Sequence, residues 1–362
     1  MFRRGQPRTP EYLPEIRNEM RTYLDHNATT PLRAEARVAM LAAMDVVGNP
    51  SSVHAEGRAA KALLETARTQ VAEAVGASGA DVVFVSGATE AAALALSGRG
   101  LQAAPIEHDA VHAWVDPVLP VVAGRVSVDD PASSVVQLAN SETGIVQDLP
   151  HGLAVSDITQ GFGRVPFSFS WSGVKMVFLS AHKFGGPKGV GALIFPQGTD
   201  IASQIKGGGQ EMGRRSGTEN VVAIAGVGAA AMAAQADLAA GKWDRVAELR
   251  NILEKAIEDV ESRTIFVGQG NNRLPNTSCF ATPGWKGETQ VMTMDLAGFA
   301  VSAGSACSSG KVKVSRVLRA LGLDDDLAAS AVRVSLGVDT TEDEVMRFVQ
   351  AWTDKYTRRR AA

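Results

Sequence analysis

Residues 180–189 read SAHKFGGPKG and lie between two apolar runs, 175–179 and 190–195. The runs have the length and composition of buried strands, so the polar, glycine-rich stretch predicts a turn at a strand end. Lys183 stands in that turn beside an imidazole and two glycines. A lysine amine shifts its pKa readily when it is desolvated, which suits it to bonding covalently with a carbonyl group. For this residue alone, a solvated strand-end lysine is the alternative interpretation.

An acidic residue upstream favours the chemical interpretation. Asp157 follows the short strand predicted at 154–156 and opens the sequence DITQ. Enzymes that use pyridoxal phosphate need a lysine for the cofactor aldehyde. They also need a carboxylate that keeps the pyridine nitrogen protonated, so that the ring accepts electrons. Lys183 and Asp157 together therefore predict a pyridoxal phosphate site.

The length of 362 residues predicts roughly two domains. We place an N-terminal tail at 1–21, a large cofactor-binding domain at 22–240 and a small C-terminal domain at 241–362. Hydrophobic residues make up 45% of the chain, charged residues 21%, and the net charge is −3. These values are typical of a soluble globular protein and give no electrostatic basis for binding nucleic acid.

Cysteine usage indicates the compartment. Cys279 and Cys307 are too few for a disulfide framework, and no Cys/His cluster has metal-ligand spacing. We therefore expect a cytoplasmic protein without a metal site. The N-terminal residues lack the apolar segment of a secretion signal, and no later stretch reaches about 18 apolar residues, so we expect no membrane span.

Strands alternate with short connections from residue 82 to 195, which predicts a mostly parallel α/β sheet. Ligands bind at the carboxyl ends of such strands, where Thr89, His108, Asp157 and Lys183 fall. Thr89 opens a helix after a glycine turn, and a helix N-terminus favours an anion such as phosphate, although plain helix capping explains Thr89 as well.

Two further expectations concern local structure. Thr30 and Pro31 predict the N-cap and first residue of a helix near 32–44. Beyond the helices expected at 219–240 and 243–260, strands and helices alternate, which predicts a smaller α+β unit.

The two thiols have different surroundings. Cys307 stands in a loop of small and polar residues, with Lys311 and Lys313 close by. We therefore expect its thiol to ionise more easily than the reference pKa of about 8.5 implies. Cys279 lies within an apolar strand between Ser278 and Phe280, which indicates a structural residue.

The assembled motifs resemble those of the cysteine desulfurases, the class V branch of fold-type I pyridoxal phosphate enzymes. The resemblance covers most of residues 22–355, and many motifs occur in the family's order. They are LDHNATTP at 24–31, GNPSSVH at 48–54, SGATE at 86–90, Glu107-His108, DITQ at 157–160, SAHKFGGPKG at 180–189, RSGT at 215–218, LPNTS at 274–278, GSAC at 304–307 and RVSLG at 333–337.

The resemblance implies a role for each matching residue. Lys183 would hold the cofactor aldehyde, Asp157 would pair with the pyridine nitrogen, and His108 would stack on the ring and assist proton transfer. Arg333 would bind the substrate carboxylate, a task that suits the bidentate guanidinium, and Asn27 is a second candidate substrate contact. The remaining cofactor contacts would be Gln160 and Ser141 at the phenolic oxygen, and Ala88, Thr89, Ser180, His182 and a neighbouring subunit's Thr218 at the phosphate.

The resemblance also implies the reaction and the partners. L-Cysteine would become L-alanine, with its sulfur left as a persulfide on Cys307. The long loop around Cys307 is similar to that of the subgroup that delivers sulfur to a separate acceptor, for iron–sulfur clusters or other thio-cofactors. The family resemblance further implies a homodimer.

Three departures from the family pattern stand out. Ser141 occupies a position where the family has asparagine, connections between 97 and 155 are short, and the chain stops soon after its last helix. Only 145–153 remains for one crossover, fewer than the roughly 10–12 residues that a crossover with a helix needs. We therefore expect strand side chains such as Val135, Leu138 and Val155 to be left uncovered. The N-terminal tail, the homodimer mate or a dedicated partner protein would then cover them.

Two alternatives remain open at this point. One is a selenocysteine lyase or another class V lyase or aminotransferase. The other is a degenerate paralogue that keeps the fold and acts as a binding subunit. Cys307 favours the desulfurase, because a transaminase has no use for a thiol there, whereas the short connections favour the degenerate paralogue.

Overall fold

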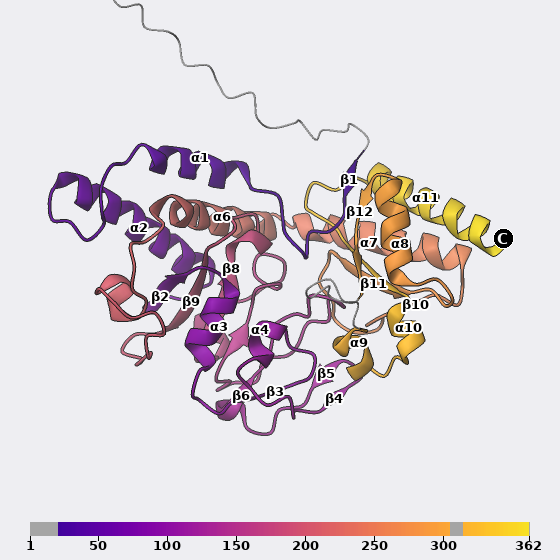
Figure 1. Ribbon diagram of the computed structural model, residues 1–362, viewed down its shortest axis with the longest axis horizontal. Helices are drawn as coiled ribbons and strands as arrows, with labels where there is room; N and C mark the ends of the chain where they lie inside the picture. Colours follow the sequence, from indigo (N-terminus) through magenta and orange to yellow (C-terminus); the bar gives the residue numbers. More distant parts are fainter. Residues whose placement is uncertain (1–20, 305–313, 362) are drawn as a thin grey trace, which may run out of the picture.

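The computed structural model describes residues 21–304 and 314–361, which form two lobes that meet where helix α6 is followed by α7 (Figure 1). The large lobe consists of α1 (Ala34–Met44), α2 (Ala55–Ala74), β2 (Ala80–Val85), α3 (Ala88–Leu96), β3 (Gln102–Ala103), α4 (Asp109–His112), β4 (Val121–Val122), β5 (Arg125–Val126), η1 (Pro131–Ser133), β6 (Ser134–Val135), β7 (Ser156–Asp157), α5 (Phe169–Ser172), β8 (Val177–Ser180), η2 (Ala181–Lys183), β9 (Gly191–Pro196), η3 (Gln210–Gly213) and α6 (Val221–Ala239).

The small lobe contains the rest of the described chain, and it also takes in the first described strand. Its elements are β1 (Thr22–Tyr23), α7 (Lys242–Val260), β10 (Ile265–Phe266), β11 (Thr277–Ala281), α8 (Gly287–Leu296), β12 (Phe299–Ala300), β13 (Ser302–Ala303), α9 (Arg316–Ala320), α10 (Asp325–Ala329), β14 (Ala331–Ser335) and α11 (Glu342–Ala361).

The sheet of the large lobe is mostly parallel, as the strand pattern predicts. Its strands follow the order β2-β9-β8-β7, and a parallel bridge between Val135 and Val155 continues the order to β6 and β3. Only β9 runs opposite to its neighbours β2 and β8 among these strands. The runs that form β8 and β9 are almost entirely buried, which explains why they lack the alternation of a half-exposed strand.

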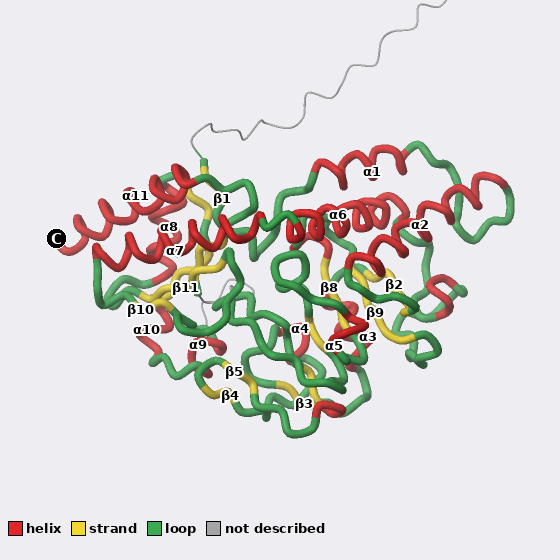
Figure 2. The backbone as a smooth tube through the Cα atoms, turned by 180° about the vertical axis from the view of Figure 1, so that it is seen from behind, coloured by secondary structure: helices red, strands yellow, loops and turns green. Residues whose placement is uncertain are grey.

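Helices cover both faces of this sheet. On one face, Leu64 and Val71 of α2 and Val227 of α6 share a core cluster with strand residues such as Val82 and Val177. On the other face, α3 packs through Leu96 and its neighbours. Figures 1 and 2 both place α1, α6 and α2 side by side. The large lobe is therefore a three-layer α/β/α arrangement.

The small lobe is an α+β unit, as expected. Strands β10-β11-β14-β13 form an antiparallel sheet, and β1 pairs in parallel with β12. Its core contains Phe280, Phe348 and Trp352, together with Leu24 from the start of the described chain. The segment that follows β1 therefore crosses from the small lobe into the large one before α1 begins.

The region between 97 and 155 corrects one expectation. No helix forms in the crossover at 145–153, as its length predicts. Val135, Leu138 and Val155 are nevertheless buried, so the expectation that they lack a cover is wrong. Val135 and Val155 pack with α3, while Leu138 lies in the opposite cluster.

The chain itself supplies that cover on the Leu138 face. The short hairpin of β4 and β5 contributes Val126 and Val128, and Leu149 packs beside them. Val317 of α9 joins Ile106 and Leu119 in an adjoining small cluster. The hairpin and α9 thus cover this region of the large lobe, and all three side chains are buried by residues of the chain itself.

We expected no stretch of about 18 apolar residues, but helix α6 is long and apolar enough to cross a membrane. An 18-residue window has a mean hydropathy of 1.6. More than half of that window is buried, and its alanine-rich faces pack against the sheet and α2. The composition of α6 is that of a helix buried inside a protein core.

We predict that Leu138→Ala destabilises the protein by about 2–5 kcal/mol, because it removes buried apolar contacts and leaves a cavity. Val118→Ala is the control, since Val118 is 60% exposed and its replacement should leave stability nearly unchanged. Urea unfolding of both variants measures the difference. Equal unfolding midpoints for the two variants would show that Leu138 is not buried in solution.

Candidate active site

Lys183 ends the turn η2, directly after strand β8. Its Nζ donates hydrogen bonds to the backbone oxygens of Asn27 at 2.7 Å and Ala28 at 2.9 Å. Burial, followed by the charges of Arg333 and Arg164, lowers the pKa of Lys183 to about 8. A lowered pKa leaves more of the amine neutral near physiological pH, and the neutral amine is the form that attacks carbonyl groups.

The segment before α1 holds this lysine turn in place. Thr30 donates two hydrogen bonds to this turn. Its hydroxyl donates to the Lys183 backbone oxygen at 2.9 Å, and its N–H donates to the His182 backbone oxygen at 2.8 Å. The expectation that Thr30 caps the first helix is therefore wrong, because α1 begins at Ala34 with Arg33 as its N-cap. Thr30 is needed for a long-range contact that helix-capping statistics do not describe.

Asp157 ends β7, the strand next to β8. The Thr159 N–H donates to Asp157 Oδ1 at 2.8 Å, and among the described residues no hydrogen bond reaches Oδ2. Burial raises the pKa of Asp157, while the bonds from Thr159 and the charges of His108 and Lys183 oppose that rise. One carboxylate oxygen therefore remains available for a cationic or N–H donor.

His108 follows β3 and caps α4. Its Nδ1 accepts a hydrogen bond from the Ala110 N–H at 3.1 Å, which places the proton of the neutral ring on Nε2. The neighbouring Glu107 is almost fully buried, and burial raises its pKa well above the ordinary value. An exposed imidazole thus stands beside a buried carboxyl whose burial favours its neutral form.

An anion cradle lies at the start of α3. The N-cap Gly87 provides no side-chain cap, so the first backbone N–H groups of α3, from Ala88 onward, lack the usual capping oxygen. The Ser180 hydroxyl at the end of β8 lies close to this helix end, since a Cβ built on Gly87 would be 3.6 Å from it. His182 pairs with the Thr29 hydroxyl at 3.2 Å, and burial and nearby lysines lower the pKa of His182 to about 4.

These groups fit pyridoxal phosphate. An amine follows β8, a carboxylate with a free oxygen ends β7, and a helix N-terminus suited to phosphate follows β2. Because these strands run parallel, their ends lie at one edge of the sheet. The observation that decides the fit is Asp157 Oδ2, which accepts no hydrogen bond from the described residues and lies on a partly buried carboxylate. A protonated ring nitrogen would form a charge-assisted hydrogen bond with it.

The observed bonds of Asn27 do not match its expected role as a substrate contact. Its Nδ2 donates to the Ser141 oxygen and the Thr277 hydroxyl, and its Oδ1 accepts from Arg164 and Asn276. Four internal bonds use the whole hydrogen-bonding capacity of the amide. The side chain is buried, so Asn27 connects the two lobes instead of offering a free group to substrate.

Arg333, on β14, is the second substrate-binding candidate. Its guanidinium pairs with Asp25 at 2.7 Å and donates to the Ser141 oxygen at 3.1 Å. Its buried Nε has no hydrogen-bond partner among the described residues. Arg333 therefore keeps one donor that no described residue uses.

The remaining predicted residues have different positions. Gln160 is buried beside Asn27, and Ser141 uses its backbone oxygen as described above. Thr218 is exposed, in a chain segment whose Arg215 is tied to Glu90 of α3 at 2.9 Å.

The two cysteines lie in different parts of the chain, and the structure describes only one of them. Cys279 is fully buried in β11, and burial raises its pKa to about 12, which confirms it as a structural residue. Cys307, with Lys311 and Lys313, lies outside the described residues. The ends of the described chain on either side are anchored at the site: Ser302 donates to Asp25 at 2.8 Å, and Arg316 donates to the Glu107 oxygen at 3.0 Å.

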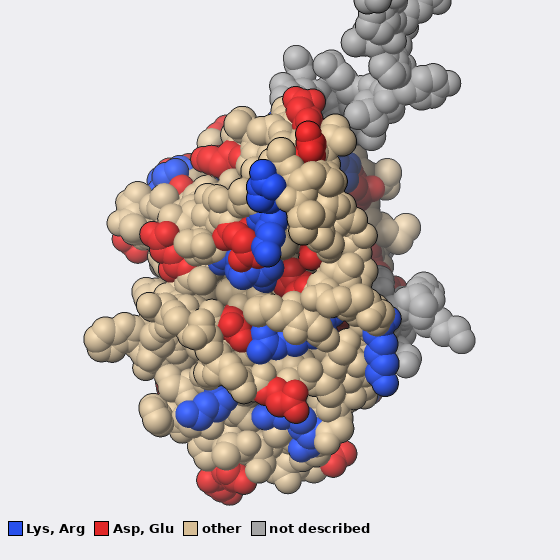
Figure 3. Space-filling model, turned by 90° about the vertical axis from the view of Figure 1, so that its left-hand side faces the viewer, with Lys and Arg blue, Asp and Glu red and all other residues tan. Residues whose placement is uncertain are grey.

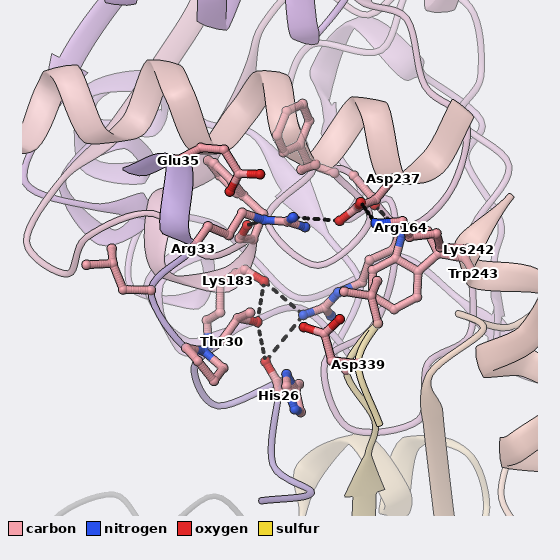
Figure 4. A pocket seen from close by; sticks show the side chains of 18 of the residues that line it. His26, Thr30, Arg33, Glu35, Arg164, Lys183, Asp237, Lys242, Trp243 and Asp339 are labelled. Atoms are coloured by element: carbon pink, nitrogen blue, oxygen red, sulfur yellow. Dashed lines mark hydrogen bonds and ion pairs between the residues drawn. The ribbon is translucent and has the colours of Figure 1, made fainter. Parts of the chain in front are cut away.

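A cavity of about 330 Å³ opens between the lobes near the backbone of Lys183 (Figure 4). Arg33 pairs there with Asp237 at 2.5 Å, and Lys242 pairs with the same carboxylate at 2.6 Å. Arg164 also lines the cavity, and the sequence reasoning overlooked it. The available signal was a basic residue in the apolar, glycine-containing turn that follows Gln160.

Comparisons with known proteins agree with this geometry. Residues 22–111 and 129–348 match the aminotransferase class-V family. The chain is 38% identical to a cysteine desulfurase of Cereibacter sphaeroides, over 91% of this chain and 94% of that one, and 35% identical to the cysteine desulfurase IscS of Dictyoglomus turgidum, over 89% and 91%. The structure of a NifS-like protein from Rickettsia africae superposes with a TM-score of 0.84 at 30% identity, over 93% of this chain and 99% of that one. The chain therefore belongs to the cysteine desulfurases of the aminotransferase class-V family, fold-type I enzymes whose cofactor is pyridoxal 5'-phosphate.

Proposed function

We propose that this protein converts L-cysteine to L-alanine and leaves the sulfur as a persulfide on Cys307. The observation that carries the proposal is the partly buried Lys183, with its pKa lowered to about 8, held by the segment 27–30 near the free oxygen of Asp157. An acceptor protein for iron–sulfur cluster or thio-cofactor assembly would take the sulfur. A cytoplasmic location fits the small number of cysteines and a reaction that needs a free thiol.

The bound cofactor supplies an aldehyde for the substrate amine and a ring that accepts electrons. Asp157 would keep the pyridine nitrogen protonated through its free oxygen, and the α3 N-terminus with Ser180 would bind the phosphate. Lys183 Nζ would remove the proton from the substrate Cα, a task that suits an amine with a pKa of about 8. Arg333 would hold the substrate carboxylate, and His108 would lie against the cofactor ring.

Cys307 completes the reaction as the sulfur acceptor. Its thiolate attacks the substrate sulfur, the carbon–sulfur bond breaks, and the products are alanine and the Cys307 persulfide, so no external oxidant is required. Both flanking segments are bonded to site residues, Ser302 to Asp25 and Arg316 to Glu107. These anchors support delivery of the thiol to the substrate.

The arrangement of the site argues against a degenerate binding subunit. A degenerate binding subunit has no need for a partly buried lysine with a lowered pKa beside Asp157. The strand side chains Val135, Leu138 and Val155, whose expected exposure favoured that alternative, are buried within the chain. A preference for selenocysteine is tested by comparing turnover of the two amino acids in the same assay. We retain the desulfurase as the main proposal.

A homodimer is part of the proposal. Apolar side chains of α1 and the connection to α2 are between 54 and 88% exposed, namely Val38, Leu41, Met44, Val47 and Val53. Figure 3 faces the end of the large lobe where the chain passes from α1 to α2, and wide uncharged areas there separate charges of both signs. Such a surface suits a second copy of the chain, whose active site would receive the exposed Thr218.

We predict that Lys183→Ala abolishes turnover and the covalent attachment of cofactor while the fold remains intact. Proton transfer by a positioned side chain is typically worth about 10²–10⁴-fold, and loss of the covalent link adds to this. Visible absorbance reports attachment, alanine and sulfide release from L-cysteine reports turnover, and circular dichroism reports the fold. Turnover at the wild-type rate would refute the proposed role.

We predict that Cys307→Ser binds L-cysteine but releases no sulfur, because a hydroxyl is a far poorer nucleophile than a thiolate near neutral pH. Cys279→Ser is the matched control and should keep sulfur transfer, provided that it folds. Mass spectrometry after treatment with cysteine locates the added sulfur. A persulfide on Cys279 instead of Cys307 would reverse the assignment of the two thiols.

We predict that Leu41→Glu weakens self-association at least tenfold, because it places a charge in an apolar contact. Leu296→Glu on α8 is the control, since Leu296 is 89% exposed on the other lobe. Analytical ultracentrifugation of the loaded enzyme compares the two. Wild-type association of Leu41→Glu would place the dimer contact elsewhere.

A further inference from the structure

Arg164 is a buried cation at the centre of the site. It is 4% exposed and stands in the turn after Gln160, between the inter-lobe cavity and the Lys183 backbone (Figure 4). Neither the motifs of the sequence analysis nor the proposed reaction gives it a role.

All the hydrogen-bond acceptors of Arg164 are neutral oxygens. Its Nη1 donates to Asn27 Oδ1 at 2.8 Å and to Gln160 Oε1 at 2.6 Å. Its Nη2 donates to the backbone oxygens of Lys183 at 2.9 Å and His26 at 3.3 Å. No carboxylate of the described chain forms an ion pair with it. One guanidinium thus joins three segments: 26–27, the Gln160 turn and the Lys183 turn.

A buried charge without a counter-ion is costly. Burial, with the charges of Arg333 and Arg33, lowers the pKa of Arg164 to about 9. A neutral side chain of similar size would fill this space at a lower cost. The presence of an arginine therefore points to a task that needs its fork of donors or its charge.

The contact with Gln160 identifies that task. The two ends of an amide have nearly the same shape, so hydrogen bonds decide which end faces which neighbour. Arg164 has only donors, so Gln160 must turn its oxygen toward Arg164 and its Nε2 away from it. One Nε2 hydrogen reaches the Asn27 oxygen at 3.0 Å, and the second is left for another acceptor.

We propose that Arg164 is a positioning residue that fixes the donor end of the Gln160 amide toward the cofactor's phenolic oxygen and holds the Lys183 backbone. The inference rests on the proposed function, because the family resemblance assigns Gln160 to that oxygen. Arg164 touches neither substrate nor cofactor in this assignment and acts through its two neighbours. Its charge assists, since it is one of the two cations that lower the pKa of Lys183.

The test uses the pH-dependent visible absorbance of the loaded enzyme, a signal that requires no turnover. Arg164→Met removes both the fork and the charge, so the midpoint of the absorbance change should rise by about one pH unit. Arg164→Lys keeps the charge but loses the fork, so its midpoint should rise by a smaller amount. Both variants should lose kcat by at least tenfold.

Arg273→Met is the matched control. Arg273 is also buried, but it pairs with Glu254 of α7 at 2.8 Å, so its loss should lower the melting temperature without moving the absorbance midpoint. A second control tests the route through Gln160. In a Gln160→Leu background, Arg164→Met should shift the midpoint by less than it does in the wild type, because coupled residues are not additive.

A wild-type midpoint in Arg164→Met, with a melting temperature lowered as in Arg273→Met, would overturn the inference and leave Arg164 a structural residue. Should Arg164→Met not fold, Arg164→Lys decides: a raised midpoint supports the inference, and an unchanged midpoint with unchanged kcat refutes it. An enzyme that shows these shifts but makes no alanine from cysteine would disprove the proposed function and not the role of Arg164.

Discussion

The contact between the segment 25–30 and the Lys183 turn is the interaction on which the rest of this structure depends. Lys183 Nζ bonds to two backbone oxygens of that segment, while Thr30 bonds back to the lysine turn. The segment starts in the small lobe, where Leu24 is part of the core, and ends in the large lobe at α1. One short stretch of chain therefore sets the position of the lysine and the relative placement of the lobes.

The electrostatics of the site follow from burial. Lys183, Arg164 and Arg333 lie close enough to affect one another, and each of the first two has a pKa below its ordinary value. Arg333 has a compensating partner in Asp25. A concentration of partly compensated positive charge suits a site whose ligands carry a phosphate and a carboxylate, because these anions supply the missing countercharge.

Local patterns predicted much of the fold. The apolar runs before Asp157 and Lys183 are strands, α7 lies within a residue of its expected start, and Cys279 is buried in a strand. These features depend on neighbouring residues alone. The α/β class follows from the alternation of such runs, so it was also accessible from the sequence.

The features that the sequence reasoning missed depend on contacts between distant segments. Thr30 reads as a helix cap, yet it serves Lys183, more than 150 positions later. Leu138 looked uncovered because no helix precedes Asp157, whereas it is buried in the large-lobe core, with its side chain against Gly161. Arg164 gave no periodic or motif signal, because its partners, apart from Gln160, come from the segments around 26–27 and 183. Chain order does not show which segments meet in space.

The pairing of β1 with β12 has a consequence for how the protein is made. Thr22 lies opposite Phe299 in that pair, so the first described strand has to wait until residues near 300 have left the ribosome. The segment 25–30 passes from this strand to the lysine turn, and until then it is anchored only at its large-lobe end. Contacts of such long sequence separation form slowly. Assembly of the lysine pocket is therefore a late event in biosynthesis, after the large lobe's sheet has been synthesised.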